Sequence, residues 1–127
     1  MQITPSAVSS AKILLVDDQA SSLLLLRELL QDLATLYFAT DGAHALELAR
    51  KHHPELIVLD IEMPGINGYE TAVKLRQISN LTQTPIIAMT AHHSDDIRQR
   101  CLQAGMNTML SKPIDAAELA RVIDSWL

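Results

Sequence analysis

The chain has 127 residues, of which 48% are hydrophobic, so it is long enough to form one domain with a buried core. Ten basic residues against fifteen acidic ones give a net charge of −5, and Lys and Arg do not cluster along the sequence, which argues against nucleic acid as a direct ligand. The single cysteine excludes a disulfide framework, and no apolar run approaches the roughly 18 residues that a membrane helix needs.

The first ten residues, MQITPSAVSS, are small and polar and lack the basic and apolar segments of a signal peptide. We therefore expect residues 1–10 to be a linker end or flexible leader, and residues 11–127 to be the folded domain. Because the cysteine content fits a reducing compartment and no targeting segment is recognisable, the expected location is the cytoplasm.

Short apolar runs alternate with amphipathic segments along the rest of the chain. In the first half we expect a strand at 12–16, a helix at 21–33, a strand at 35–40, a helix at about 42–52 and a strand at 56–59. The first helix places leucines 23, 26, 30 and 33 on one face. Its run of four consecutive leucines from Leu23 is wider than one face needs, so part of it is expected to be exposed. Asp41 is a suitable N-cap for the second helix.

In the second half we expect a helix at about 67–79, a strand at 85–89, a helix at about 95–104, a strand at 108–110 and a last helix after residue 115. Asn67 and Asp115 each precede a Glu by three residues, the spacing of a capping box. Gly105 is a usual helix-stop residue. The last helix has one apolar stripe, formed by Leu119, Val122, Ile123 and Trp126.

Strict alternation of five strands and five helices predicts an α/β fold with a parallel sheet covered by helices on both faces. The strands are continuously apolar rather than alternating, as expected when both faces are buried. Right-handed crossovers leave few topologies, and we expect a doubly wound five-stranded sheet with the order 2-1-3-4-5.

Chemistry-bearing residues follow four of the predicted strands. Asp17 and Asp18 follow the first strand, Asp60 the third, Thr90 the fourth and Lys112 the fifth. In open α/β sheets, ligands bind beyond the carboxyl ends of the strands, near the point where the strand order reverses. Strands one and three are neighbours in the expected order, so three carboxylates should converge there beside a hydroxyl and an ammonium group.

Three carboxylates in one place need a partner of opposite charge. Two like charges about 4 Å apart repel by roughly 4 kcal/mol at an effective dielectric of 20, so either one carboxylate is protonated or a cation lies among them. Oxygen ligands without His or Cys favour a hard cation, Mg²⁺ first and Mn²⁺ as an alternative. A carboxylate beside such an ion and a lysine can attack phosphorus, and Asp60 is the candidate nucleophile.

Four motifs give the chain a family resemblance. They are VDD at 16–18, LDIEMPGINGYE at 59–70, MTA at 89–91 and SKP at 111–113. With them, residues 12–127 resemble the response-regulator receiver domains of two-component signalling, which have the flavodoxin-like form of the doubly wound fold.

The resemblance implies a role for each residue of the site. Asp60 would accept a phosphoryl group from a phosphohistidine on a sensor histidine kinase or a histidine phosphotransfer domain. Asp17, Asp18 and Asp60 would hold Mg²⁺, with the backbone carbonyl of Glu62 as a further ligand. Lys112 would contact the phosphoryl group.

The resemblance also concerns the response to phosphorylation. Thr90 would move toward the phosphoryl group, and a cis Lys112-Pro113 bond is typical of the family. One departure is Met109, where the family usually has Tyr or Phe as a rotating partner of the threonine, so transmission through an aromatic side chain is not expected.

Two further positions in the family influence how fast the phosphoryl group is lost. They lie two residues beyond the phosphoacceptor and two beyond the threonine, and this chain has Glu62 and His92 there. An additional acid beside the site bears on the lifetime of the phosphoryl group, but the sequence gives no direction for the effect.

The stretch at 100–114, RCLQAGMNTMLSKPI, is similar to receivers attached to hybrid histidine kinases, so we expect the receiver of such a kinase, with a stand-alone response regulator as the alternative. The domain itself would be a phosphoryl acceptor with at most slow self-dephosphorylation, whereas a parent chain would be a histidine protein kinase. We expect partner contacts at the leucine-rich helix, including Leu23 and Leu24, and around the last strand and helix, with no contact to a membrane or to nucleic acid.

Two other functions remain open. A haloacid-dehalogenase-like phosphatase also uses Asp and Mg²⁺, but its D-x-D-x-T motif follows the first strand, and Asp17-Asp18-Gln19 does not fit that motif. A phosphorylation-independent interaction module would not need the complete acidic set.

Overall fold

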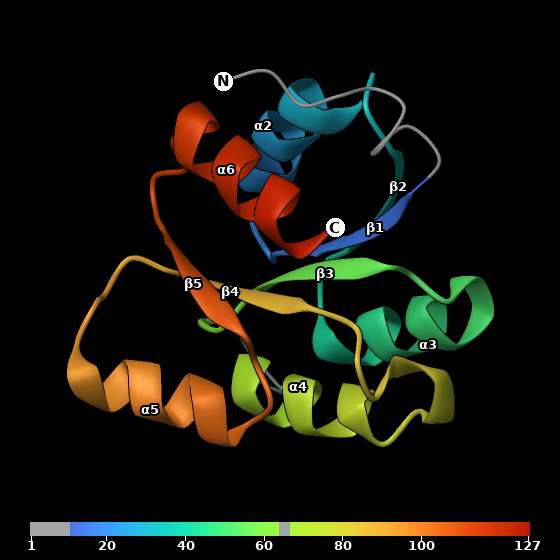
Figure 1. The fold of residues 1–127 in the computed structure, drawn as a ribbon, viewed down its shortest axis with the longest axis vertical. Coiled ribbons are helices and arrows are strands. Elements are labelled where there is room, and N and C mark those ends of the chain that lie inside the picture. Colours follow the sequence, from blue (N-terminus) through green and yellow to red (C-terminus); the bar gives the residue numbers. More distant parts are fainter. Residues whose placement is uncertain (1–10, 64–66) are drawn as a thin grey trace.

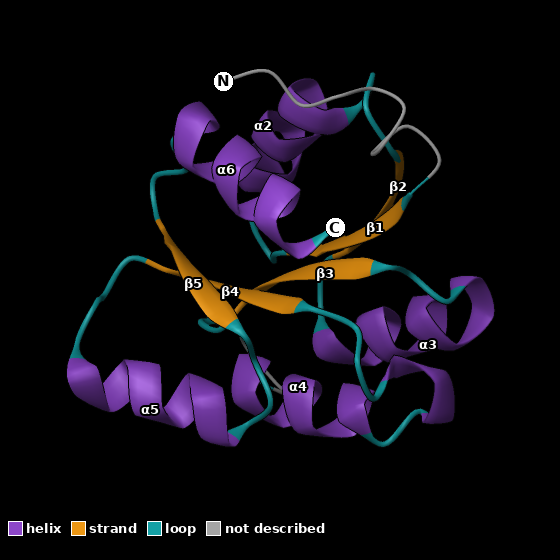
Figure 2. Cartoon of the chain, in the orientation of Figure 1, coloured by secondary structure: helices purple, strands orange, loops and turns teal. Residues whose placement is uncertain are grey.

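The computed structural model describes residues 11–63 and 67–127, and the expected leader at 1–10 lies outside the described residues. The described strands are β1 (Lys12–Val16), β2 (Thr35–Ala39), β3 (Leu56–Asp60), β4 (Ile86–Thr90) and β5 (Thr108–Ser111). The described helices are α2 (Ala20–Leu30), α3 (Gly42–His52), α4 (Gly68–Arg76), α5 (Asp95–Gln103) and α6 (Ala116–Trp126), with a short 3₁₀ helix η1 (Ser79–Leu81). Figure 2 shows this alternation of strands and helices.

The five strands form one parallel sheet in the order β2-β1-β3-β4-β5, which confirms the predicted topology. Helices α2 and α6 cover one face of the sheet, and α3, α4 and α5 cover the other (Figure 1). The strand order reverses beside β1 and β3, so the carboxyl ends of these neighbouring strands define the crevice in which such sheets bind ligands.

The sheet has a hydrophobic core on each face, because successive side chains of a strand point to opposite sides. In β1, Leu14 and Val16 pack with the α3–α5 layer, whereas Ile13 and Leu15 pack with α2 and α6. All five residues of β3 are buried. The continuous apolar runs in the sequence therefore correspond to strands that are covered on both sides, as predicted.

Most element boundaries differ from the predicted ones by only a few residues. Helix α2 ends at Leu30 instead of residue 33, because the chain turns there to enter β2, with the amide of Leu33 donating to the carbonyl of Leu30. Strands β3 and β4 each extend one residue further than predicted, so that Asp60 and Thr90 are their last residues.

Side-chain caps start most of the described helices. Asp41 accepts a hydrogen bond from the amide of His44 at 2.8 Å, and Asn67 and Asp115 accept from the amides of the glutamates three residues on, both at 3.0 Å. These contacts confirm the capping residues read from the sequence. No side chain caps α2, whose N-cap position is occupied by Gln19.

The leucine run of α2 divides between core and surface. Leu23, Leu26 and Leu30 are buried, whereas Leu24 is 56% and Leu25 38% exposed. The prediction that part of the run is exposed is confirmed, but the expectation that Leu23 is available to a partner was wrong, because its side chain packs in the α2–α6 core. The stripe of α6 is buried at Leu119 and Ile123, while Trp126 lies at the surface.

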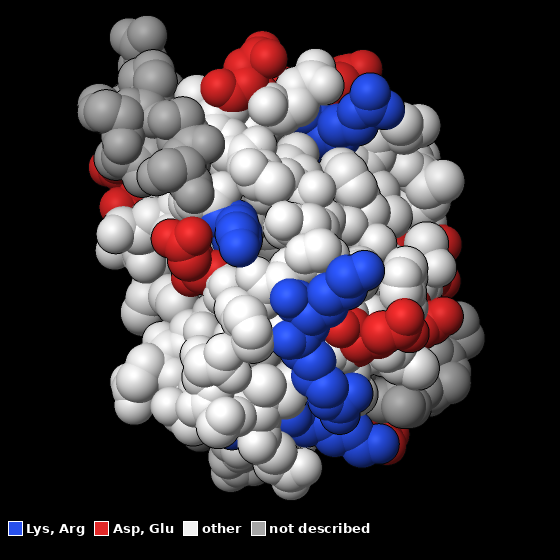
Figure 3. Space-filling view, turned by 90° about the vertical axis from the view of Figure 1, so that its right-hand side faces the viewer, with Lys and Arg blue, Asp and Glu red and all other residues white. Residues whose placement is uncertain are grey.

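Charged side chains are unevenly distributed over the surface. Figure 3 shows one face on which Lys and Arg side chains form a band with acidic side chains beside it. The last turns of α3 and α4 contribute cations, and Arg50 and Lys74 line one shallow hollow there. Cations at helix C-termini complement the helix dipole. None of the described helices combines the length and the apolar character that crossing a bilayer requires.

Arg76 holds together three segments near the amino-terminal ends of β4 and β5. Its guanidinium donates hydrogen bonds to four acceptors, the carbonyls of Leu81, Thr84 and Gly105 and the side chain of Asn107. These contacts join the end of α4 to the loop before β4 and to the turn before β5. The planar fork of Arg suits such an arrangement, and the single ammonium of Lys does not reproduce it.

We therefore predict that Arg76→Lys lowers the free energy of unfolding by about 2 to 4 kcal/mol, because hydrogen bonds from a charged donor to partly buried carbonyls are lost. Urea unfolding followed by circular dichroism measures the change. The matched control is Arg98→Lys on the exposed side of α5, where we expect a change within about 0.5 kcal/mol. Equal effects at both positions would contradict the role given to Arg76.

Candidate functional site

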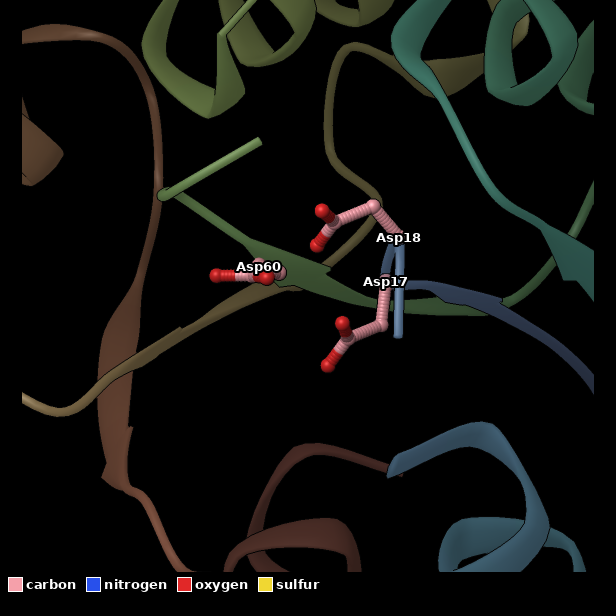
Figure 4. A group of neighbouring side chains, drawn as sticks. All are labelled: Asp17, Asp18 and Asp60. Carbon is pink, nitrogen blue, oxygen red and sulfur yellow. The ribbon is translucent and has the colours of Figure 1, made fainter. Parts of the chain in front are cut away.

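The carboxyl ends of β1 and β3 bring three carboxylates together. Asp17 and Asp18 follow β1 directly, and Asp60 ends β3, whose residue Leu59 pairs with Val16 of β1. Ligand oxygens of the three side chains lie within 4.8 Å of one another (Figure 4). Asp17 and Asp60 are buried, whereas Asp18 is exposed. The predicted convergence is confirmed.

Lys112 contributes an ammonium group to this cluster. Its Nζ lies 2.8 Å from Oδ2 of Asp17 and 3.2 Å from Oδ2 of Asp60. The backbone amide of Lys112 donates to the carbonyl of Thr90, which fixes the start of its loop to the end of β4. The Lys112-Pro113 bond is cis, as the resemblance implied.

The charges in the cluster do not balance, because three carboxylates face one ammonium group. Two carboxylates 4.8 Å apart repel by roughly 3 kcal/mol at an effective dielectric of 20. Burial raises the pKa of Asp60, and the charge of Asp17 raises it further, while the amide of Glu62 and the ammonium of Lys112 oppose the increase. Burial alone would lower the pKa of Lys112, but its close contacts with the carboxylates of Asp17 and Asp60 raise it overall.

The oxygens of Asp17 show where a cation would fit. Oδ1 accepts a hydrogen bond from the amide of Gln19 at 2.9 Å. Oδ2 is buried and accepts no well-directed hydrogen bond within the described part of the chain, although Lys112 Nζ lies close to it. A buried carboxylate oxygen with free acceptor capacity, two further carboxylates and no His or Cys in the group form the donor set that Mg²⁺ prefers.

Asp60 is held from a second direction by the loop that follows it. Its Oδ1 accepts a hydrogen bond from the amide of Glu62 at 2.9 Å. Gly68, the first residue of α4, packs directly against this loop. A Cβ at Gly68 would overlap the Cα of Ile61 and lie 2.6 Å from the carbonyl oxygen of Asp60, so only glycine lets the helix approach so closely.

Thr90 is buried at the end of β4, and its hydroxyl faces Glu62. Oε1 of Glu62 lies 3.1 Å from the hydroxyl of Thr90 and accepts a hydrogen bond from the amide of Ala91 at 3.1 Å. The sequence pointed to Glu62 through its backbone carbonyl and as an additional acid beside the site, but it did not show what the side chain contacts. The only signal in the sequence was an acid two residues beyond Asp60, and no spacing rule says which loop such a side chain reaches.

A cavity of about 610 Å³ opens beside Asp60 and Lys112. Its wall includes the start of α2 and the residues after the cis bond, and these surroundings were also missed from the sequence. They are Ser21, Ser22 and Leu25 on one side and Pro113 and Ile114 on the other. The carboxylate of Asp60 is therefore open to a reactant that approaches between α2 and the β5–α6 loop.

Comparison with known proteins agrees with this geometry. The family model described as response regulator receiver domain matches residues 13–124. The sensor histidine kinase GacS of Pseudomonas protegens is 35% identical over 119 residues, which cover 91% of this chain and 13% of that protein. The response regulator DivK of Brucella ovis, described as a polar-differentiation regulator, is 34% identical over 116 residues, covering 91% of this chain and 94% of that protein.

A solved structure extends the comparison to the acidic site. It is the receiver domain of the sensor histidine kinase PA1611 from Pseudomonas aeruginosa, with a magnesium ion coordinated in its active site cleft. It has a TM-score of 0.85 and 34% sequence identity, and the match covers 93% of this chain and 98% of that one. None of these matches supports the alternative of a haloacid-dehalogenase-like phosphatase.

We predict that Asp60→Asn raises the free energy of unfolding at pH 7 in EDTA, because it removes a buried like charge. The raised pKa of Asp60 sets the sign: its ionisation destabilises the fold increasingly as the pH rises above the ordinary value of 3.8, so the difference between the variant and the wild type should narrow toward that pH. Urea unfolding at several pH values measures it.

Repeating the unfolding experiment with Mg²⁺ should reverse which of the two proteins, the wild type or Asp60→Asn, is the more stable. Mg²⁺ should stabilise the wild type by about 3 kcal/mol at a concentration a hundred times its dissociation constant, and Asp60→Asn much less. Asp32→Asn, an exposed aspartate away from the site, is the control and should behave as the wild type in both buffers. An equal response to Mg²⁺ in all three proteins would contradict a metal site at Asp60.

Proposed function

This chain belongs to the response regulator receiver domains, and from that premise we propose that Asp60 is its phosphoacceptor in a two-component phosphorelay. The observation that carries the proposal is the buried carboxylate of Asp60, held beside Lys112 and two further aspartates and facing an open cavity. The same observation argues against a phosphorylation-independent interaction module, which would gain nothing from such a cluster.

In the proposed reaction a carboxylate oxygen of Asp60 attacks the phosphorus of a phosphohistidine. A P–O bond forms, the P–N bond breaks, and the leaving imidazole keeps the electron pair and takes up a proton. Lys112, already 3.2 Å from Asp60, would neutralise negative charge on the phosphoryl oxygens. Mg²⁺, held by Asp17, Asp18, Asp60 and the carbonyl of Glu62, would supply the remaining positive charge, and Mn²⁺ is the alternative ion.

We assign the phosphoryl donor to a sensor histidine kinase or a histidine phosphotransfer domain. The cavity beside Asp60 supports this, because an imidazole on a partner could enter between α2 and the β5–α6 loop. Leu25 lines that cavity, and Leu24, which is also exposed, lines a second hollow on the same helix with Ala20 and Phe38, so both leucines present apolar surface on α2. These features support a partner surface on α2, with the segment after β5 beside it.

The parent protein is proposed to be a hybrid sensor histidine kinase in the cytoplasm or on the cytoplasmic side of a membrane. This chain spans 13% of GacS, the size relation expected of a receiver within a larger kinase. The alternative is a stand-alone regulator, because the chain spans 94% of DivK. Under either arrangement the described domain acts as acceptor, and histidine kinase activity would belong to other domains.

We predict that Mg²⁺ with acetyl phosphate adds one phosphoryl group, detected by intact mass. Labelling should be lost in EDTA and in Asp60→Asn, because the first removes the cation and the second the nucleophile. Asp32→Asn should be labelled as the wild type is. Labelling that persists in Asp60→Asn would show that another residue is the acceptor.

The proposed partner surface has its own test. Leu24→Glu should slow transfer from a phosphorylated histidine kinase at least about tenfold, because it puts a charge into the apolar contact, while labelling by acetyl phosphate stays unchanged. The matched control is Leu102→Glu on α5, where the leucine is also exposed, at 46%, but lies on the opposite side of the sheet. An equal loss at both positions, or none at Leu24, would place the partner elsewhere.

A further inference from the structure

Glu62 connects the proposed phosphoacceptor to the loop after β4. Its backbone amide donates to Oδ1 of Asp60 at 2.9 Å, and its carboxylate reaches the other way, to the hydroxyl of Thr90 and the amide of Ala91. His92 Nε2 lies 3.6 Å from the second carboxylate oxygen, Oε2. One residue therefore contacts both the group that would be phosphorylated and the loop that would respond.

The donors that Glu62 occupies are suited to an anion. The hydroxyl of Thr90 and the amide of Ala91 converge on one oxygen, Oε1, at 3.1 Å each. A hydroxyl and a neighbouring amide that share one anionic oxygen form the kind of donor pair that also binds a phosphoryl oxygen. In this structure the carboxylate of Glu62 occupies both donors.

From these contacts we propose that Glu62 is a competing ligand for the Thr90–Ala91 donor pair, and that phosphorylation must displace its carboxylate before Thr90 can turn to the phosphoryl group. This inference rests on the proposed phosphorylation of Asp60. It assigns the side chain of Glu62 a positioning role that is separate from the role of its backbone carbonyl.

The surroundings of Glu62 allow this displacement. Phosphorylation converts the carboxylate of Asp60, with one negative charge, into an acyl phosphate with about −1.5 to −2 charges. The net gain of about one half to one negative charge, two residues away, repels the carboxylate of Glu62. The side chain of Glu62 is 43% exposed, so solvent is available to its carboxylate once it leaves Thr90. The Thr90 hydroxyl also lies 3.0 Å from the carbonyl of His92, which provides an acceptor while the glutamate departs.

The contact also predicts whether Glu62 favours or opposes the phosphoryl-bound form of the loop, which the sequence left open. A competing carboxylate makes the phosphoryl-bound form harder to reach, so removing it should favour that form. Met109 stands where the family usually has an aromatic partner for the threonine. It pairs with Ala88 in the sheet and has no polar group that could contact the Thr90 hydroxyl. The polar contact to Glu62 supplies the competing arrangement instead.

The test uses Glu62→Ala, Glu62→Gln and Glu62→Asp with beryllofluoride, an analogue of the phosphoryl group, titrated calorimetrically at saturating Mg²⁺. We expect Glu62→Ala to bind beryllofluoride roughly tenfold more tightly than the wild type, and Glu62→Gln to fall between them. Glu62→Asp keeps the charge on a shorter side chain that cannot reach Thr90. It should therefore resemble Glu62→Ala if the contact matters, and the wild type if only the charge does.

A second readout needs no phosphoryl analogue. The amide of Ala91 should exchange its hydrogen with solvent faster in Glu62→Ala and Glu62→Asp than in the wild type, because its acceptor is lost. Glu47→Ala, an exposed glutamate on α3, changes the net charge equally and should alter neither readout.

The possible failures are distinguishable. Unchanged beryllofluoride affinity in every Glu62 variant, or an affinity for Glu62→Asp equal to that of the wild type, would overturn the competition. A wild-type protein that binds no beryllofluoride and takes up no phosphoryl group would instead overturn the proposed function. Unchanged exchange at Ala91 would show that Glu62 does not hold this amide in solution.

Discussion

Repulsion among three carboxylates at the ends of β1 and β3 is the constraint on which the rest of the site depends. Asp17 and Asp60 are buried within 4.8 Å of each other and of Asp18, and Lys112 neutralises only one of the three charges. The fold tolerates this because two parallel strands end side by side and fix their terminal residues in the sheet. The excess negative charge favours a hard dication at the site, and such an ion would make chemistry with phosphate feasible.

Contacts from the surrounding structure hold Asp17 and Asp60 in place. Gly68 allows α4 to pack against the backbone of Asp60 and Ile61. The amide of Gln19 donates to one oxygen of Asp17. Arg76 fixes the turns that precede β4 and β5. On the open side, Thr90 and Ala91 contact Glu62 and not the acidic cluster. A buried acidic cluster beside a loop with its own separate contacts is compatible with the two-state response proposed for Thr90.

Much of this could be predicted from the sequence, because the signals are local or follow from topology. Continuous apolar runs indicated strands covered on both faces, and strand order then brought Asp17, Asp18 and Asp60 to one edge. The sequence could not show that Leu25 and Ile114 line one cavity beside Asp60, because that depends on how α2 and the β5–α6 loop lie in space. Nor could it show that the Glu62 side chain reaches Ala91, because such a contact between loops depends on side-chain direction and not on spacing.

The most direct measurement of the central claim is the anomalous diffraction of crystals grown with Mn²⁺, the heavier alternative to Mg²⁺. The account predicts one strong peak in contact with carboxylate oxygens of Asp17, Asp18 and Asp60 and with the backbone carbonyl of Glu62. A map without such a peak, or with the ion bound elsewhere while the three side chains keep their places, would show that they tolerate one another without a cation and would contradict the account.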